Sequence, residues 1–465
     1  MSEPDDSLRQ ATAAQLRAMV EWAFSPAGRD IPQAARRKAA LVLGDNIAAI
    51  VAAQDEPEVA RVQAQLAAGG SGAGVSVFRA GLPRTDRISA ALANGIAGSW
   101  CELDEGYRLA PCHAGLYVIP ALLAEAETLG LTAGELIDAM ALSYELTARM
   151  ARTWIFPQMT LHPHPQTAAI GGAMAVAVCR RFDAATAFNA LTSASTLITV
   201  GGYSHAVQGA LVRNVWSAVG TANGMRAADW SALGIGGMPD GPYSVFTELL
   251  GQRPSPQALT QGLGDEWAVC NGYHKIHACC QSTHSAVEAT LEALQALPPG
   301  TSHADIADIH LQTHRPSMSN KSPSTSLAGK FSYDHVLATT LVNGHAGADA
   351  FGAQWLHDPA VARLREQVRL SLFEPALPRP HDRPARLTLR LHDGRQIQTE
   401  CLSARGGPDR PFEPEVLHKK IETLVSVAFP HLARKLLALC DLPPALLAQP
   451  WSQLLAEDRA AAGPA

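Results

Sequence analysis

The sequence predicts a mainly α-helical fold with a smaller α/β part, and three observations support this class. Apolar residues recur at helical spacing from about residue 8 to residue 263. After Asn271 the pattern changes to short runs in which apolar and polar residues alternate, as in strands. Helical spacing returns beyond Pro414. We therefore expect a helical domain interrupted by an α/β insertion, with boundaries at 8–268, 269–408 and 409–460.

The helical part begins with a strong periodic segment. Residues 34–53 carry apolar side chains along roughly one helical face. Thr132 and Glu135 have the spacing of a capping box before the next apolar run, and Asp183 is a good N-cap residue before residues 184–197. Alanine and glycine are abundant here, so we expect helices that pack closely.

The α/β part is predicted from four alternating segments. Residues 305–313 and 367–372 alternate apolar and polar side chains. Residues 386–391 and 396–401 do so too, and His392-Asp-Gly-Arg395 between them is a hairpin signal. The sequence therefore predicts a small sheet that contains a hairpin.

Composition excludes several classes of function. The chain has 465 residues, 37 basic and 43 acidic side chains and a net charge of −6, which argues against a nucleic-acid partner. It is 47% hydrophobic, as expected for a packed globular protein. Residues 1–6 lack the features of a signal peptide, and no apolar run reaches the roughly 20 residues that span a bilayer. We expect a cytoplasmic protein with no membrane partner.

Two other motifs, a glycine-rich stretch and a segment rich in histidine and cysteine, each allow a structural interpretation besides a functional one. The glycine-rich stretch 69–74 lacks the Lys-Ser/Thr of a phosphate loop, so we interpret it as a flexible loop. The side chains of His274, His277, Cys280 and His284 could ligate zinc, but their spacing matches no zinc signature. We expect no metal, and these histidines either are structural or act as acids and bases.

A short acidic segment offers a candidate site. Glu102, Asp104 and Glu105 lie close in sequence to His113, just before a predicted helix. The segment is either a solvated turn or a carboxylate–histidine network that transfers a proton.

Several blocks of sequence, in order, resemble the MmgE/PrpD family, which contains 2-methylcitrate dehydratase, cis-aconitate decarboxylase and iminodisuccinate epimerase. The resemblance extends from about residue 12 to residue 455. Its blocks are Ala93-Asn-Gly to Glu105, His113, Ile119 to Glu125, Ser143-Tyr-Glu-Leu, His162-Pro, Lys275 to His284, Gly329-Lys330-Phe-Ser332, Asn343-Gly344 and Gly406-Gly-Pro to Pro414.

The resemblance implies a fold and a type of chemistry. Family members have a large all-helical domain built from both chain ends and an inserted α/β lid domain, and they form homodimers. Their active site lies in the cleft between the two domains. They use no metal or organic cofactor, and their chemistry begins at a carbon next to a carboxylate or imine.

The family's loop residues can be placed on this sequence. Its three aspartates fall on Glu102, Asp104 and Glu105, and its threonine falls on Gly106, which removes a hydroxyl. Its loop histidine falls on His113.

The remaining family positions fall later in the chain. The second histidine falls on His162, with His164 as the competing choice. The family lysine falls on Arg213, which stays charged and would clamp a carboxylate. The family tyrosine falls on His335, where an imidazole would titrate near neutrality.

Together with these residues, the resemblance implies a cofactor-independent lyase, either a dehydratase or a decarboxylase. Its substrate would be a small di- or tricarboxylate, and a proton would be transferred at a carbon next to a carboxylate. The expected catalytic residues are His113, His162 and His335, with Glu102 or Asp104 orienting His113. The expected substrate-binding residues are Arg213, Lys275, Lys330, His164 and His284.

Two alternatives remain open. An epimerase or racemase of the iminodisuccinate type needs two opposed acid/base groups, and His335 facing His113 would supply the second. A non-catalytic paralogue that binds carboxylates would explain the substitutions at Glu102, Gly106, Arg213 and His335.

Overall fold

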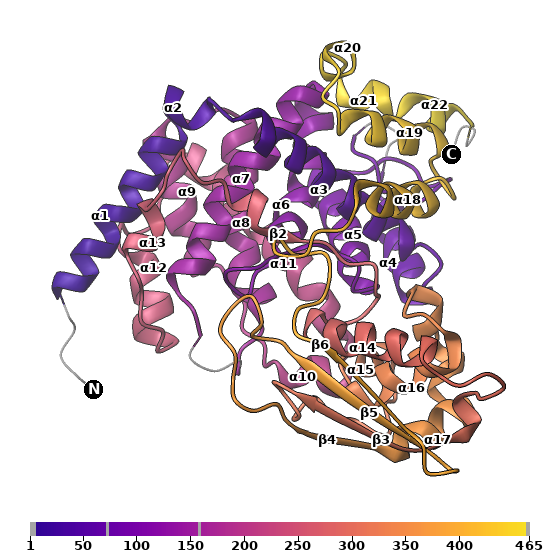
Figure 1. Cartoon of the computed structure of the whole chain (residues 1–465). Helices are drawn as coiled ribbons and strands as arrows, with labels where there is room; N and C mark the ends of the chain where they lie inside the picture. Colours follow the sequence, from indigo (N-terminus) through magenta and orange to yellow (C-terminus); the bar gives the residue numbers. More distant parts are fainter. Residues whose placement is uncertain (1–5, 71–73, 157–159, 462–465) are drawn as a thin grey trace.

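A computed structural model describes residues 6–70, 74–156 and 160–461 of the chain. The structure is 59% helical and 8% strand over the residues that it describes, which confirms a mainly helical fold with a smaller α/β part. Figure 1 shows a large helical body and, below it, a smaller part that contains the main sheet. Residues 71–73 of the glycine-rich stretch lie outside the described residues.

The large body is a layered set of helices around a buried core. Its helices are α1 (Asp6–Ala23), α2 (Pro26–Arg29), α3 (Gln33–Ala52), α4 (Pro57–Ala67), α5 (Arg87–Trp100), α6 (Ala114–Leu129), α7 (Ala133–Thr153), α8 (Pro163–Cys179), α9 (Ala184–Thr196), α11 (Trp216–Ala232), α12 (Gly241–Tyr243) and α13 (Gln257–Thr260). Helix α10 (Ser204–Gln208) comes from the same stretch of sequence but packs against α15 (Ser326–Lys330) in the smaller part.

Small residues and caps explain how these helices form and pack. A Cβ atom on Gly224 of α11 would collide with the backbone of Ala169 in α8, so glycine is required for the close approach of these two helices. The capping box of Thr132 and Glu135 is present at the start of α7. The Asp183 side chain accepts a hydrogen bond from the Thr186 amide at the start of α9. Both predicted helix starts are therefore confirmed.

The main sheet has the strand order β4-β3-β5-β6. Its strands are β3 (Ile306–Thr313), β4 (Val368–Leu372), β5 (Ala385–Leu391) and β6 (Gln396–Cys401), and its associated helices are α14 (His284–Gln295), α15 (Ser326–Lys330), α16 (Tyr333–Asn343) and α17 (Pro359–Gln367). Strand β3 is parallel to β4 and antiparallel to β5. Strands β5 and β6 form the predicted hairpin, in which Gly394 has φ +90°.

The C-terminal helices return to the large body. They are α18 (Pro414–Val425), α19 (Pro430–Leu439), α20 (Pro444–Leu447), α21 (Trp451–Leu454) and α22 (Ala456–Ala461). Helices α18 and α19 pack against α3, and Figure 1 shows these yellow segments beside the indigo N-terminal region. The large body is thus built from both ends of the chain.

A second, very short sheet connects distant parts of the chain. Strand β1 (Gly106–Tyr107) pairs antiparallel with β2 (Gly272–Tyr273). This pairing places the acidic segment that precedes β1 beside the segment that begins with Tyr273.

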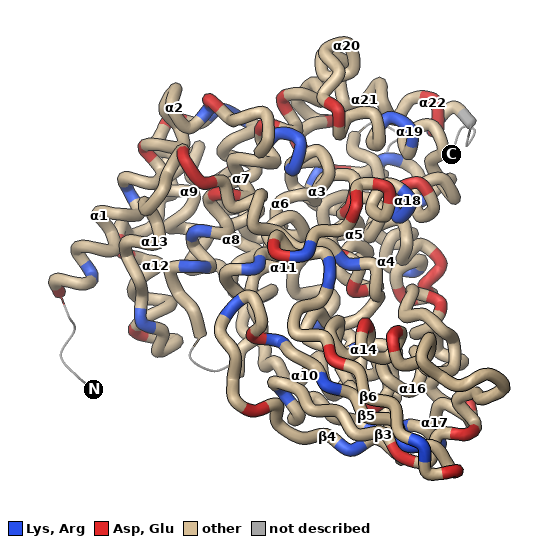
Figure 2. The backbone as a smooth tube through the Cα atoms, viewed as in Figure 1, with Lys and Arg blue, Asp and Glu red and all other residues tan. Residues whose placement is uncertain are grey.

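Surface charge and helix length bear on the expected partners. In the view of Figure 2, basic and acidic residues are interspersed along the backbone instead of forming one basic face. None of the helices in the described ranges is both long and apolar enough to cross a membrane.

Candidate active site

The acidic segment between α5 and β1 is buried, so it is not a solvated turn. Glu102 is 2% exposed, Asp104 1% and Glu105 0%. Glu102 has φ +55°, in the left-handed region that few residues other than glycine adopt. Such backbone strain is often found at functional sites.

Two cations balance the charges of the first two carboxylates. Glu102 forms an ion pair with Arg213, and its other oxygen lies 3.5 Å from Lys275 Nζ. Lys275 Nζ is also 3.4 Å from Asp104 Oδ1. Burial alone would raise the pKa of Asp104, but Lys275 and His113 lower it well below its usual range. Asp104 is therefore ionised at neutral pH.

His113 is held in a defined tautomer by two acceptors. Its Nδ1 lies 2.6 Å from Asp104 Oδ2 and 2.9 Å from the Glu105 carbonyl oxygen. Because the Glu105 carbonyl oxygen accepts a hydrogen bond from Nδ1 and the Asp104 carboxylate lies against it, Nδ1 carries a proton, and Nε2 of the neutral ring is left as the base. His113 has the arrangement of a general base oriented by a carboxylate.

His162 is enclosed by donors. It caps α8, where its Nδ1 lies 3.3 Å from the His164 amide nitrogen. Its Nε2 lies 3.2 Å from Arg213 Nε. Burial and the Arg213 charge hold the pKa of His162 well below its ordinary value. His162 is therefore neutral, and its Nε2 faces a guanidinium.

His164 connects the other two histidines. Its ring centroid lies 4.4 Å from that of His162 and 4.9 Å from that of His113. Its Nδ1 is 2.8 Å from the Tyr117 hydroxyl. Burial and Arg213 lower the pKa of His164 well below the usual value for histidine. The structure therefore brings together both candidates for the second family histidine.

A pocket of about 60 Å³ lies against this cluster. Glu102, His113, His162 and Arg213 form one wall. Tyr203, Tyr273, Cys280, Phe331 and Arg383 are among the other lining residues. Phe331 and Arg383 come from the α/β part, so both parts of the chain line the pocket.

Three expected site residues have other neighbours. Lys330 donates a hydrogen bond to the Trp100 carbonyl oxygen, at 3.1 Å. His284 Nε2 lies 3.2 Å from the Cys279 carbonyl oxygen. His335 Nδ1 lies 3.1 Å from Arg365 Nη1. None of these three residues is among the described residues that line the 60 Å³ pocket.

The position of His335 corrects two expectations. It lies in the first turn of α16 with its ring against Phe351, inside the α/β part, and does not face His113 across the pocket. Burial and the Arg365 charge lower the pKa of His335 to about 3. The ring therefore stays neutral near pH 7 and does not titrate there.

The residues considered as zinc ligands contact other side chains instead of one another's ligand atoms around a common point. His274 Nδ1 lies 2.8 Å from Asp45 Oδ2. The rings of His277 and His284 lie edge to face. Within the described part of the chain, no group of three or more His, Cys, Asp or Glu side chains is arranged to hold a metal ion.

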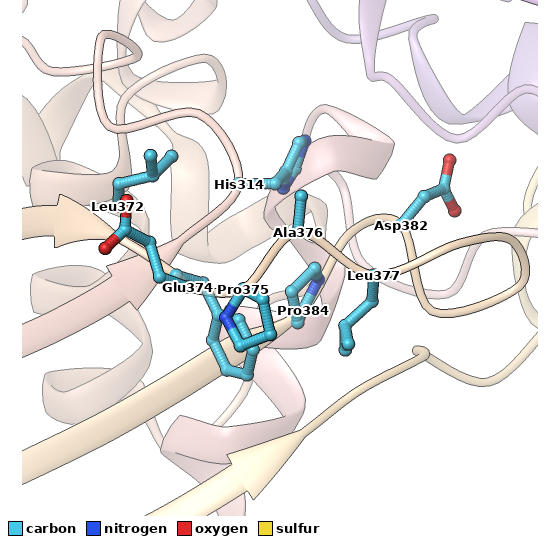
Figure 3. Close-up of a pocket in the computed structure, with 9 residues that line it drawn as sticks. His314, Leu372, Glu374, Pro375, Ala376, Leu377, Asp382 and Pro384 are labelled. Atoms are coloured by element: carbon cyan, nitrogen blue, oxygen red, sulfur yellow. The ribbon is translucent and has the colours of Figure 1, made fainter.

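A larger pocket of about 580 Å³ lies nearby, but its lining does not suit an anion. Its ionisable lining residues are His314, Glu374 and Asp382, shown in Figure 3, and the other lining residues are apolar. No Lys or Arg is among its described lining residues, whereas Arg213 and Arg383 line the smaller pocket and can attract a carboxylate. The smaller pocket is therefore the better candidate active site.

Tyr273 and Arg383 are two of the lining residues that were not expected from the sequence. Tyr273 lies two residues before Lys275, and this proximity is a signal that could have identified it. Arg383 lies in a proline-rich connection between β4 and β5. The path of that connection depends on tertiary contacts, so the sequence pattern gives no comparable signal for Arg383.

Comparisons with known proteins identify the family of the chain. The model of the MmgE/PrpD N-terminal domain matches residues 17–244, and that of the MmgE/PrpD C-terminal domain matches residues 277–441. The chain belongs to the MmgE/PrpD family. The N-terminal match contains the acidic segment and the three clustered histidines, whereas Tyr273 and Lys275 lie between the two matches.

Curated MmgE/PrpD relatives include fungal proteins of low identity. The chain is 27% identical over 434 residues to a cis-aconitate decarboxylase of Aspergillus terreus, which covers 86% of each chain. It is 24% identical over 369 residues to the cis-aconitate decarboxylase-like protein oryM of Aspergillus oryzae. That match covers 73% of this chain and 75% of the relative.

Proposed function

We propose that the chain is an MmgE/PrpD-type lyase that acts on a small di- or tricarboxylate without a cofactor. The observation that carries this proposal is the pair formed by His113 and Asp104 beside a pocket that Arg213 also lines. The pair provides a base, and the cation attracts an anionic substrate.

His113 is the proposed acid/base group. With Nδ1 held by Asp104, Nε2 can take a proton from a substrate carbon or return one. The nearby ionised carboxylate stabilises the imidazolium that forms. Glu102 has a different role, because it pairs with Arg213 and Lys275 and thus fixes both cations next to the pocket.

His162 is a weaker candidate for proton transfer than His113. Its Nε2 faces Arg213 Nε and its Nδ1 faces the backbone of His164. We assign it to positioning Arg213.

Decarboxylation is the first reaction to test, since the relatives are named as cis-aconitate decarboxylases. In such a reaction the bond between a carboxylate and the substrate carbon chain breaks and CO₂ leaves. The electron pair that remains shifts through the substrate, and His113, which has first taken a proton from water on Nε2, adds that proton to carbon. Dehydration would use the same base to remove a proton from carbon before hydroxide leaves.

The two alternatives have less support. Epimerisation was expected to use His335 as the second group, but His335 contacts Arg365 inside the α/β part. A non-catalytic paralogue would not need to keep the His113–Asp104 pair next to a cation-lined pocket.

The test is proton NMR in D₂O with cis-aconitate and citrate-like substrates. The wild-type chain should either release CO₂ and place deuterium on the carbon that is protonated, or release water and lose a C–H proton of the substrate without adding deuterium to the product. His113→Gln should reduce turnover about 10²–10⁴-fold, the usual contribution of a general base. His392→Gln, an exposed histidine in the hairpin turn, is the matched control and should leave turnover unchanged.

Two results would contradict this assignment. Turnover by His113→Gln at the wild-type rate would exclude His113 as the base. Deuterium exchange with inversion of configuration, and without loss of CO₂ or water, would replace the lyase by an epimerase.

A further inference from the structure

The connection between β4 and β5 is held against the large body. Arg108 Nη2 donates a hydrogen bond to the Pro380 carbonyl oxygen at 2.8 Å and also pairs with Asp382. Arg379 donates to the Leu109 carbonyl oxygen. These contacts join the connection to the segment that follows the acidic residues. Arg383, which comes directly after Asp382, thereby lies at the pocket.

Arg383 differs from the other cations of the site because no carboxylate among the described residues forms an ion pair with it. Arg213 pairs with Glu102, and Lys275 contacts two carboxylates. The adjacent Asp382 is occupied by Arg108. No hydrogen bond or ion pair joins Arg383 to any residue in the described ranges. A guanidinium in this state is suited to bind a carboxylate from outside the protein.

Tyr273 supplies a hydroxyl group at the same pocket. Its ring centroid lies 6.3 Å from that of His113. A Cβ atom on Gly106 would overlap the Tyr273 hydroxyl, so the absence of a side chain at residue 106 makes room for this group. The hydroxyl has no hydrogen-bond partner among the described residues. Burial holds the pKa of Tyr273 above its ordinary value, so the hydroxyl stays protonated and can donate.

We propose that Arg383 and Tyr273 together bind a substrate carboxylate that is not next to the reacting carbon. The inference rests on the proposed function, because it places this carboxylate relative to the carbon that His113 protonates. It implies that the substrate carries at least two carboxylates: one near Arg213 and His113, and one held by the connection between β4 and β5. The α/β part then contributes directly to substrate specificity.

Binding of a non-reacting ligand tests this carboxylate-binding site independently of turnover. Propane-1,2,3-tricarboxylate is saturated and serves as the probe in calorimetric titrations of the full chain. Arg383→Gln should weaken its binding about 10–100-fold, the range expected for loss of a charge-assisted contact. Arg383→Lys should recover part of the affinity, and Tyr273→Phe should lose about 3–10-fold because one neutral donor is removed.

Arg390→Gln is the matched control. Arg390 is an exposed arginine on β5, so its variant carries the same change of charge in the same part of the chain. It should bind the probe as the wild type does. Three results would contradict this carboxylate-binding site: Arg383→Gln binds the probe as tightly as the wild type, Arg390→Gln loses as much affinity as Arg383→Gln, or the wild type does not bind the probe.

Kinetics separate this inference from the proposed function. With a substrate that the wild type turns over, Arg383→Gln should raise KM by the factor found for binding and leave kcat within about threefold, as expected when uniform binding is lost. If the wild type binds the probe through Arg383 but turns over no substrate, the proposed function is contradicted and the carboxylate-binding site is retained. If the wild type turns over substrate but neither binding nor KM depends on Arg383, the carboxylate-binding site is contradicted and the proposed function is retained.

Discussion

Glu105 is the carboxylate of the acidic segment that has no basic partner among the described residues. It is fully buried, and it accepts hydrogen bonds from the Tyr144 hydroxyl at 2.9 Å and the Gly115 amide at 2.6 Å. Burial raises the pKa of Glu105 to about 8, although these two donors oppose the shift. The residue is therefore largely protonated at neutral pH, unlike Asp104.

This difference predicts a pH dependence of stability. The folded chain keeps the Glu105 proton up to pH about 8, whereas the unfolded chain releases it near the ordinary value of 4.5. The free energy of unfolding should therefore fall as pH rises through this window, by about 2 kcal/mol between pH 6 and 8 from this group. Glu105→Gln should lack this part of the slope in chemical denaturation at pH 6, 7 and 8. Glu422→Gln, an exposed control on α18, should keep it; equal slopes in all three proteins would contradict the shift.

Gly106 gives a second prediction at the residue scale. Because a Cβ atom there would overlap the Tyr273 hydroxyl, Gly106→Ala should displace the Tyr273 ring from the pocket. We expect turnover to fall about tenfold or more and stability to fall by about 1–3 kcal/mol, as for overpacking of a well-packed site. Thermal melting and steady-state kinetics measure the two effects. Gly69→Ala is the control, because a Cβ atom there meets open space, and it should leave both stability and turnover unchanged. Gly81→Ala is not suitable, because Gly81 has a positive φ.

The sequence identified the residue types of the site better than their contacts. The spacing of Asp104 and His113 around a short turn allowed their pairing to be expected, and these two residues do contact each other. His335 lies more than 200 residues away from His113, so its direction depends on how α16 packs. The His335 ring is buried and contacts Arg365, and no local sequence pattern indicates this contact.

Helix α18 shows how one element supports the site from outside. Lys420 donates a hydrogen bond to the Leu103 carbonyl oxygen at 2.7 Å, within the acidic segment, and its Nζ lies 2.6 Å from Asp45 on α3. Asp45 also pairs with His274, which follows β2. The C-terminal helices therefore fix the backbone on which Glu102 and Asp104 are carried.

Removing this support should cost both stability and activity. Lys420→Met leaves the buried Asp45 carboxylate with one partner fewer, and loss of one member of a buried pair typically costs about 3–5 kcal/mol. Lys419→Met, an exposed neighbour on the same helix, should be nearly neutral. The double variant Asp45→Asn with Lys420→Met should recover part of the stability, because no buried charge is then left. Chemical denaturation of the four proteins measures these differences; a double variant less stable than Lys420→Met would argue against the ion pair.

Long periodic elements could be predicted from the sequence, whereas very short ones could not. The four main strands and the starts of α7 and α9 follow from alternation and capping residues within each segment. Strands β1 and β2 have two residues each, and they exist because residues 106–107 and 272–273 meet in the folded chain. The pairing that places Tyr273 at the site is a tertiary property, so the only sequence signal for this residue is that it lies two positions before Lys275.

At the scale of the whole molecule, exposed apolar side chains are concentrated in one segment of the sequence. Seven of the eleven large hydrophobic side chains that are exposed among the described residues lie within residues 200–249: Val200, Val212, Trp230, Leu233, Ile235, Met238 and Leu249. Leu233 and Leu249 are each 78% exposed. Interfaces with other proteins often carry exposed apolar side chains.

We propose that this region forms the interface of the homodimer expected from the family resemblance. In a two-fold symmetric dimer each substituted side chain is present twice at the same interface, so one substitution has a doubled effect. Leu233→Asp combined with Met238→Asp should therefore convert a species of twice 49.2 kDa into one of 49.2 kDa in light scattering after size exclusion. Val427→Asp changes another exposed apolar residue, 71% exposed on the C-terminal side of α18, and should leave the mass unchanged. A wild-type chain that is monomeric, or a double variant that stays dimeric, would exclude this interface.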